Sequence, residues 1–292
     1  MIAQVIINGM LAGALIGLLA LGFTLVVRTA RIIHIAHAAT FTTGGYVGLW
    51  LLRTWDVSLI TAACGAMGAG AAVGFLIECC VYRSLRKQRA SSVSVFLASL
   101  AVVVIIQNTI GLVFGNEIQI APSRFGQEVL SICGARITTW QGLSILVSVS
   151  AFILTTIIMQ FTKTGRLARA IGSDADLAQI AGVKLENVLM KVALFSALLG
   201  GLAGYMIAYD RSITPSNGLN LILLAITAAI VGGVGSVPGA LIGGIIVGLT
   251  RQFAGWQLPS QWQDAIVFML LLVILVIRPQ GLFGKPIRRS TA

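Results

Sequence analysis

The residues best suited to chemistry in this chain are two histidines and three threonines near the start of its second apolar segment. His34 and His37 are three residues apart, so they share one face of a helix, and Thr40, Thr42 and Thr43 follow them. Unpaired polar groups in hydrocarbon cost several kcal/mol, so such side chains face protein or water. A metal site is not expected, because no Cys, Asp or Glu lies close by. The pair is either structural, bonded to a neighbouring helix, or part of a polar path for a solute.

A second unusual stretch, V-G-G-V-G-S-V-P-G-A-L-I-G-G, lies late in the chain between two apolar runs of about 16 residues each. Pro238 lacks a backbone N–H and disfavours helix at Val237. A tight turn between short spans and a pair of broken helices lining a cavity both fit, and short segments interrupted by Gly or Pro are typical of transport routes. The candidate path residues here are Gly232, Gly233, Gly235, Ser236 and Pro238.

A polar loop from Lys163 to Lys191 separates two long apolar runs and contains signals for short helices. Gly165 frees the chain from the preceding run, and a short helical turn follows. Ser173 and Asp176 fit an S-x-x-D helix cap, and Gly182 is placed to end that helix. The loop is therefore expected to be ordered.

The second predicted helix of this loop carries a narrow apolar stripe of Leu177, Ile180 and Ala181 opposite its charges. So short a helix buries too little surface to be stable alone, and it has to pack against something. It packs either on its own bundle or on a soluble partner. We favour a preformed docking element, because a structured, charged loop of this size is unusual in a chain otherwise built for lipid.

The sequence offers no means of binding ATP through a phosphate-binding loop. G-x-x-x-x-G-K-[ST] does not occur, and the Gly284-Lys285 pair is followed by Pro286. No apolar run carries a central Asp or Glu of the kind that proton-driven carriers use, since Glu78 lies near the end of its run, within reach of Arg83 and water. No nucleophile-base pair is visible either. An enzyme is disfavoured, and a secondary transporter or a passive channel is kept as an alternative to a carrier energised by another subunit.

The elements that position these residues are apolar helices long enough for a membrane. Of 292 residues 57 % are hydrophobic and 10 % charged, with a mean hydropathy of +0.96, values outside the range of soluble domains. A bilayer core roughly 30 Å thick needs about 20 apolar residues per helix. The predicted segments are 4–27, 32–52, 58–82, 93–114, 141–162, 192–209, 219–234, 239–254 and 264–277. The fold prediction is all-α: one polytopic transmembrane bundle over residues 1–292, with about eight or nine membrane segments, some short or broken.

The charges predict the orientation of this bundle. If the segments are successive spans, most of the 20 lysines and arginines and the whole formal charge of +11 fall on the face that carries the loop 163–191. Under the positive-inside rule that face is cytoplasmic, the N-terminus is outside and the C-terminus is in the cytoplasm. This membrane topology explains the excess of Lys and Arg over Asp and Glu, so nucleic acid is not an expected partner. The first Lys or Arg is Arg28, so the first run is expected to stay as a span.

Small residues are expected to hold the helices together, because hydrophobicity gives little association in lipid. Successive G-x-x-x-G steps occur in the first run, and the pentapeptide G-A-L-I-G occurs twice, at 13–17 and 239–243, as coincidence or as the trace of a repeat. The cysteines show neither C-x-x-C nor metal-ligand spacing and are expected to be buried, reduced thiols. They are Cys64, Cys79, Cys80 and Cys133.

The loop resembles that of the permease subunits of ABC importers, and the match is to the branched-chain (hydrophobic) amino acid permease family of the LivH type. The stretch from Gly232 and the R-P-Q-G-L-F-G stretch from Arg278 support the resemblance, which covers nearly the whole chain. The latter stretch is also similar to that of the sister LivM subunit. By resemblance, the residues that couple the loop to an ATPase are Gly165, Arg166, Arg169, Ala170, Asp174, Ala178 and Gly182.

The resemblance implies an importer assembled in the bacterial inner membrane. Its parts would be this chain, a homologous LivM-like permease, two cytoplasmic ATP-binding subunits and an extracytoplasmic solute-binding protein, with ATP bound by the partners and no cofactor in this chain. Where the family has N-F-A-H-G, this chain has His34-Ile35-Ala36-His37-Ala38. The expected solute is a branched-chain or related hydrophobic amino acid, with urea, short amides or aromatic compounds as alternatives.

Overall fold

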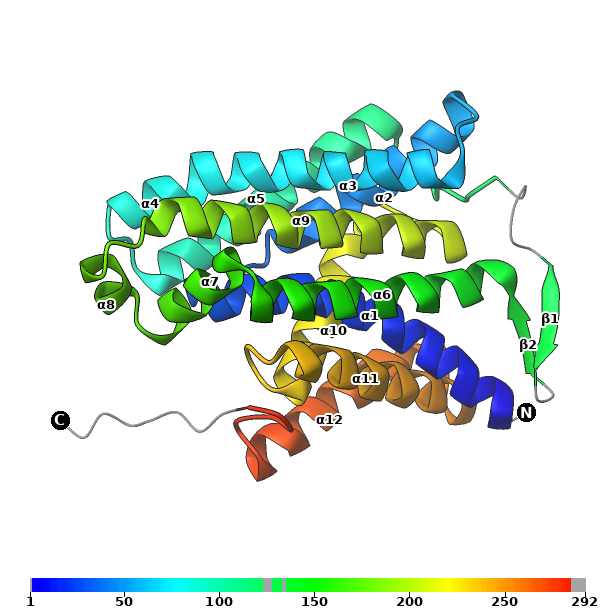
Figure 1. The fold of residues 1–292 in the computed structure, drawn as a ribbon. Helices are drawn as coiled ribbons and strands as arrows, with labels where there is room; N and C mark the ends of the chain where they lie inside the picture. Colours follow the sequence, from blue (N-terminus) through cyan, green and yellow to red (C-terminus); the bar gives the residue numbers. More distant parts are fainter. Residues whose placement is uncertain (1, 123–127, 133–134, 285–292) are drawn as a thin grey trace.

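The protein is a bundle of α-helices with one short β-hairpin, which confirms the predicted all-α fold (Figure 1). The computed structural model describes residues 2–122, 128–132 and 135–284. The first half contains α1 (Ile2–Ala30), α2 (His37–Thr54), α3 (Leu59–Leu76), a π-helical segment (Ile77–Tyr82), α4 (Arg83–Lys87), α5 (Ser92–Phe114), β1 (Val129–Ile132) and β2 (Ala135–Thr138). The second half contains α6 (Thr139–Phe161), α7 (Lys163–Ser173), α8 (Ala175–Ile180), α9 (Leu185–Asp210), α10 (Asn217–Gly232), α11 (Val237–Gln257), a 3₁₀ turn (Ser260–Trp262) and α12 (Gln263–Ile277).

Each predicted membrane segment corresponds to one of these helices. By length and composition, seven helical stretches of the described chain are long and apolar enough to cross a membrane, and α10 is a shorter apolar helix. Helix α11 is 21 residues long, so it is not the short segment that the sequence suggested. The antiparallel hairpin, in which Val129 pairs with Thr138, was not predicted.

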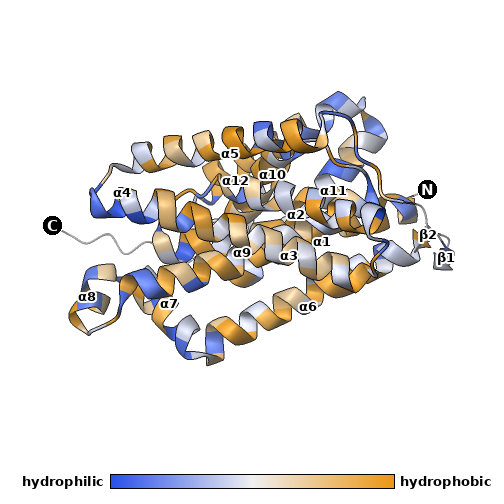
Figure 2. Ribbon diagram, turned by 90° about the horizontal axis from the view of Figure 1, so that it is seen from above, coloured by the Kyte–Doolittle hydropathy of each residue, from blue (hydrophilic) through white to orange (hydrophobic). Residues whose placement is uncertain are grey.

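The two ends of the bundle differ, and we name them by what they carry. The loop face carries α4, α7, α8 and the end of α12; the hairpin face carries β1, β2 and the start of α1 (Figure 1). Hydrophilic residues concentrate at the ends, and hydrophobic residues fill the helices between them (Figure 2). This distribution is that of a chain whose middle lies in hydrocarbon.

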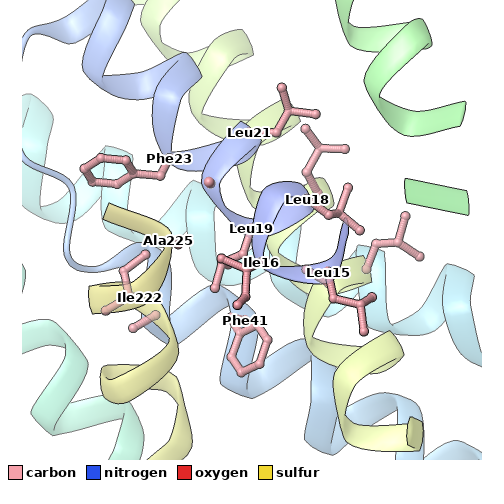
Figure 3. Close-up of a cluster of buried hydrophobic side chains, with 14 of the residues drawn as sticks. Leu15, Ile16, Leu18, Leu19, Leu21, Phe23, Phe41, Ile222 and Ala225 are labelled. Atoms are coloured by element: carbon pink, nitrogen blue, oxygen red, sulfur yellow. The ribbon is translucent and has the colours of Figure 1, made fainter. Parts of the chain in front are cut away.

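Helix α1 forms the centre of the bundle. Most of its residues are buried, among them Leu18, Leu19 and Leu21. Figure 3 shows these side chains around α1, with Phe41 of α2 below and Ile222 and Ala225 of α10 beside it. A helix buried on all sides has to contact several neighbours, and α1 contacts α9, α10 and α11.

Glycines bring the backbones of α1 and α11 together. A Cβ added at Gly13 would meet the backbone of Gly244 and Ile245, and one at Gly248 would meet the backbone of Gly13. The two G-A-L-I-G pentapeptides thus lie on facing helices, where small residues allow close approach. The predicted role of these glycines in packing between helices of one chain is confirmed.

The cysteines depart from expectation. Cys64 and Cys80 are exposed on the bundle surface and Cys79 is half-buried, and all three are free thiols. Cys133 lies outside the described residues. The prediction of burial was wrong for Cys64 and Cys80, because an apolar segment in a membrane protein has a surface for lipid as well as one for protein.

Candidate functional site

The loop between α6 and α9 begins with an abrupt change of direction at Thr162. Its hydroxyl donates to the carbonyl of Ile158 (2.6 Å) and accepts from the backbone N–H of Gly165 (3.1 Å), so one side chain ends α6 and caps α7. Gly165 lies against the backbone of Ile158 and Met159, where any Cβ would collide. The predicted role of Gly165 in releasing the chain from its span is consistent with this geometry.

Arg31 joins α7 to the end of α1. Its guanidinium donates to the carbonyl of Gly172 (2.9 and 3.2 Å) and to that of Ser173 (2.7 Å), which belong to the last turn of α7. A cation is favourable at these unpaired carbonyls because of the helix dipole. Gly172 also packs on the backbone carbonyl of Arg28. Helix α7 is therefore attached to the central helix of the bundle.

Helix α8 is a single short turn with a defined start and end. The Asp174 carboxylate accepts from the backbone N–H groups of Asp176 (3.0 Å) and Leu177 (2.9 Å). The predicted Ser173 cap was wrong, because α7 extends through Ser173 and its last carbonyls are bonded to Arg31. Gly182, with a φ of +85°, ends this helix as predicted, and the backbone bonds around it form a Schellman motif.

The two large apolar side chains of α8 are exposed. Ala178 is buried, but Leu177 is 63 % and Ile180 83 % exposed. Beside them lies an open hollow lined by Gln179, Gly182, Val183, Lys184, Leu185 and Glu186. An ordered turn with an exposed apolar stripe is the arrangement expected of a docking element.

An ion-pair network holds the start of α9, just after α8. The Arg86 guanidinium contacts the carboxylates of Glu186 (3.0 and 3.2 Å) and Glu78, and Arg83 lies 3.7 Å from Glu186. Glu78 was expected to be near Arg83 and water, but it is buried against Arg86. The π-helical segment that begins at Ile77 changes the register between these residues, which the sequence did not reveal.

The glycine-rich stretch forms a tight turn between α10 and α11. Gly233 and Gly235 have φ of +114° and +79°, and the Ser236 hydroxyl accepts from the N–H of Gly239 (3.1 Å), with Pro238 in the first turn of α11. The tight turn is thus the alternative that the structure adopts. Gly235 packs near Arg28, so this turn also reaches the end of α1.

The segment after α12 closes on this turn. The backbone N–H of Leu282 donates to the carbonyl of Val231, and that of Phe283 donates to the carbonyl of Gly232, both at 2.9 Å. The two late stretches that carried the family resemblance therefore bind each other. They meet on the loop face, near α1.

The two histidines lie inside the bundle at its loop-face half. The exposed fraction is 5 % for His34 and 0 % for His37. His34 Nδ1 is 2.6 Å from the Tyr82 hydroxyl, which donates to Ser99 Oγ (3.1 Å); Ser99 Oγ also accepts from the N–H of Ala36 (2.7 Å). His34 therefore links the chain before α2 to the π-helical segment that follows α3 and, through Tyr82, to α5.

His37 packs between α1 and α9, where Gly22 and Gly200 leave room for its ring. Its Nδ1 is 3.3 Å from Thr40 Oγ1 and 3.5 Å from Ser196 Oγ, and Ser196 donates to the carbonyl of Gly22 (2.8 Å). This geometry favours the structural interpretation. We call the group around the two rings the histidine layer; it consists of His34, His37, Thr40, Tyr82, Ser99 and Ser196.

The threonine hydroxyls of α2 bond within their own helix. Thr40, Thr42 and Thr43 donate to carbonyls three or four residues earlier, at 2.8–2.9 Å. Thr40 and Thr42 are buried and Thr43 is half-buried. The predicted path residues of α2 and of the α10–α11 turn thus lie in separate parts of the loop-face half. Among the described residues, no three His, Cys, Asp or Glu lie close enough to hold a metal ion.

Sequence reasoning missed a pocket near the hairpin face whose walls are mainly apolar. It has a volume of about 240 Å³ and lies between α2, α5 and the segment after α5. Its lining residues are Tyr46, Leu49, Trp50, Arg53, Thr54, Phe114 and Gln119. No sequence motif indicates this pocket, because Arg53 and Gln119 come from segments that are far apart in the sequence.

The family model described as "Branched-chain amino acid transport system / permease component" matches residues 5–275. The chain belongs to this family. It is therefore a permease component of a transport system, as the sequence predicted. Members similar to it include the high-affinity branched-chain amino acid transport system permease protein LivH of Salmonella typhimurium, which is 29 % identical over 97 % of this chain and 96 % of that protein.

A second permease-component relative is the branched-chain amino acid permease protein BraD of Pseudomonas aeruginosa, with 26 % identity over 97 % of this chain and 96 % of that protein. Among solved structures, PsaBC from Streptococcus pneumoniae in complex with a Fab is similar, with a TM-score of 0.52 and 12 % identity over 94 % of this chain and 91 % of that chain. The structural likeness supports the fold of this permease component alone.

Proposed function

We propose that this chain is a membrane-spanning permease subunit of an ATP-driven ABC importer for branched-chain or related hydrophobic amino acids. The observation that carries the proposal is α8, a capped turn whose apolar side chains are exposed while both of its ends are attached to the bundle. Family membership supports the solute class. Exposed apolar groups on an ordered turn indicate a protein partner.

The partner at α8 is an ATP-binding subunit. This chain has no phosphate-binding loop of its own, so energy for uphill transport enters from another polypeptide. Two such subunits, a homologous LivM-like permease and an extracytoplasmic solute-binding protein complete the assembly. In this orientation the loop face is cytoplasmic and the N-terminus lies outside the inner membrane, since the basic residues concentrate on the loop face.

Work applied at α8 has two routes into the bundle. One runs through α7 and Arg31 to the end of α1, and the other through Glu186 and Arg86 to α4 and α9. Both routes end on packed helices, which move as rigid units and do not deform continuously. Closure of the ATPases would thus tilt α1 and α9 and alternate the access of the solute path.

The solute path itself remains a proposal. We assign to it the histidine layer residues His34, His37 and Thr40, with Thr42 and Thr43, together with the α10–α11 turn. Polar groups at these positions would replace water around a zwitterion whose charges do not cross hydrocarbon unaided. Urea, short amides and aromatic compounds stay as alternative solutes, because the His34-Ile35-Ala36-His37-Ala38 segment departs from the family pattern.

The test measures both solute uptake and the ATP hydrolysis that the solute stimulates. The chain is reconstituted in liposomes with its permease partner and ATPases, and ATP-dependent uptake of labelled leucine is measured with the binding protein present. Leu177→Asp with Ile180→Asp should reduce solute-stimulated ATP hydrolysis by at least about tenfold, since central interface residues dominate binding.

The matched control is Gln88→Glu with Asn187→Asp, which adds the same two negative charges at exposed positions of the loop face. It should leave hydrolysis unchanged. Normal coupling in the Leu177/Ile180 variant would refute the docking role, and uptake driven by an ion gradient without ATP would select a secondary transporter instead.

A further inference from the structure

Helix α5 lies at the edge of the bundle and is attached to it along one side (Figure 2). Its buried residues recur at helical spacing and form a single stripe, made of Val95, Ser99, Val103 and Ile110. Ser99 fixes this stripe, because its hydroxyl oxygen accepts hydrogen bonds from the Tyr82 hydroxyl (3.1 Å) and from the N–H of Ala36 (2.7 Å). The other side of α5 is exposed and contacts either lipid or another protein.

Both ends of α5 are held in place. At its start, the Ser91 hydroxyl accepts from the N–H of Ser94 (3.1 Å). After its end, the backbones of Gln119 and Ile213 form two hydrogen bonds of 2.9 Å each, and the Arg53 guanidinium donates to the side-chain oxygen of Gln119. The exposed side of α5 is therefore a preformed surface, which loses little conformational entropy when something packs on it.

An asparagine lies on that exposed side, well inside the span. Each residue advances a helix by about 100°, so Asn108 lies roughly half a turn from the centre of the buried stripe. It precedes the last residue of α5, Phe114, by about 9 Å at 1.5 Å per residue. Its amide donates to the carbonyl of Val104 (2.7 Å), which leaves its oxygen and its second N–H for other partners. The neighbouring Gln107 is half-buried, and its side chain forms no hydrogen bond with any described residue.

Lipid is a poor neighbour for these amides. Unpaired polar groups in hydrocarbon cost several kcal/mol, and polar residues within spans normally face protein or water. Helix α12 shows the composition that suits lipid in this chain, because residues 266–277 are all apolar. Met269, Leu272 and Val276 of that helix are 63 %, 62 % and 75 % exposed. The exposed side of α5 differs from this surface by its amides, so it needs a neighbour that forms hydrogen bonds.

The residues around Asn108 indicate a helix as that neighbour. Exposed residues follow one another at spacings of three or four along this side, and we call them the α5 seam: Leu97, Ala101, Val104, Asn108 and Leu112. Such spacing is that of a face on which a second helix packs, and a small residue such as Ala101 permits close approach. An amide both donates and accepts, so it is complementary to an amide on the same helix of a chain with the same fold.

We infer that the α5 seam is the surface on which the homologous permease subunit packs, with its corresponding helix against α5 and a hydrogen bond to the Asn108 amide. Pairing like surfaces about a twofold or pseudo-twofold axis is the commonest way in which related chains associate. The inference rests on the proposed function, which requires a second permease. In this arrangement α12 faces lipid.

The first test is Asn108→Leu in the importer assembled from both permeases and the ATPases. Leucine suits lipid better than asparagine, so a lipid-facing α5 would keep its yield and its partner. If the seam is an interface, we expect the second permease to be retained about threefold less well after dilution in detergent, the usual effect of one hydrogen bond between membrane helices. The matched control is Asn116→Leu, the same change at an exposed asparagine just beyond α5, which should retain the partner as wild type does.

The second test identifies the neighbour by photo-crosslinking. Leu112→p-benzoylphenylalanine should give an adduct of this chain with the second permease, whereas Leu272→p-benzoylphenylalanine on α12 should give none. An adduct of two copies of this chain, or one with the second permease through Leu272 alone, would overturn the inference.

The outcomes also separate this inference from the proposed function. If the second permease copurifies with wild type, yet Leu112 gives no adduct and Asn108→Leu retains the partner fully, the α5 seam is excluded and the proposed function stands. If no second permease copurifies with wild type, the proposed assembly fails and the inference fails with it.

Discussion

Helix α8 and the histidine layer show opposite relations between polarity and burial. On α8, Leu177 and Ile180 are exposed and the polar Asp174 is used within the turn. In the histidine layer, His34 and His37 are buried and hydrogen-bonded to neighbouring helices. In a membrane protein, apolar side chains exposed on an aqueous loop indicate a missing protein partner, whereas polar side chains inside the bundle link helices of the same chain.

The largest expected effect breaks the histidine layer. In Gly200→Val the added side chain would meet the rings and hydroxyls of His37 and Thr40, which hydrogen bonds hold in place. We expect a cost of about 3 kcal/mol, at the top of the usual range for overpacking, and a large loss of folded protein. Detergent-solubilised yield and size-exclusion profiles measure it.

The matched glycine for that experiment is Gly68, where an added Cβ would have no atom within 4 Å. Gly68→Val should leave the yield close to wild type. Equal losses in both variants would mean that valine in any span is harmful and that packing at Gly200 is not special.

An intermediate effect separates the two interpretations of His37. His37→Ala removes a buried ring and leaves a cavity between α1 and α9, which should lower the free energy of unfolding by about 2 kcal/mol. Uptake should fall while the ATPases stay bound. His37→Gln restores a hydrogen-bonding side chain. Recovery of stability without recovery of uptake would assign His37 to the solute path, and recovery of both would leave it a packing residue.

The smallest effect sharpens the comparison at the loop. Arg31→Ala removes three hydrogen bonds to the last carbonyls of α7, which should cost about 1 kcal/mol because the site is exposed. Stimulated ATP hydrolysis should fall several-fold with membrane insertion intact. Arg89→Ala is the control, since Arg89 is an exposed loop-face arginine with a similarly positive φ. Unchanged hydrolysis in Arg31→Ala would exclude α7 as a route to α1.

The spans could be predicted from composition, because each of them is a long apolar run. The end of α8 could be predicted from Gly182, because glycine adopts the left-handed conformation that a helix end requires. Contacts between distant segments were not predictable in this way. The Arg31 bonds to α7, the Arg86–Glu186 pair and the Gln119–Ile213 bridge join residues at least 94 positions apart in the sequence. The Ser173 cap failed for the same reason, since Arg31 decides where α7 ends.

The backbone pairing of Leu282 and Phe283 with the end of α10 has a consequence for biosynthesis. Helix α10 and its turn acquire these hydrogen bonds only after residue 283 has left the ribosome. The loop-face end of the bundle therefore closes only after every helix of the bundle has been made, and a stop codon just upstream of Arg278 would release a bundle in which the end of α10 lacks these two hydrogen bonds.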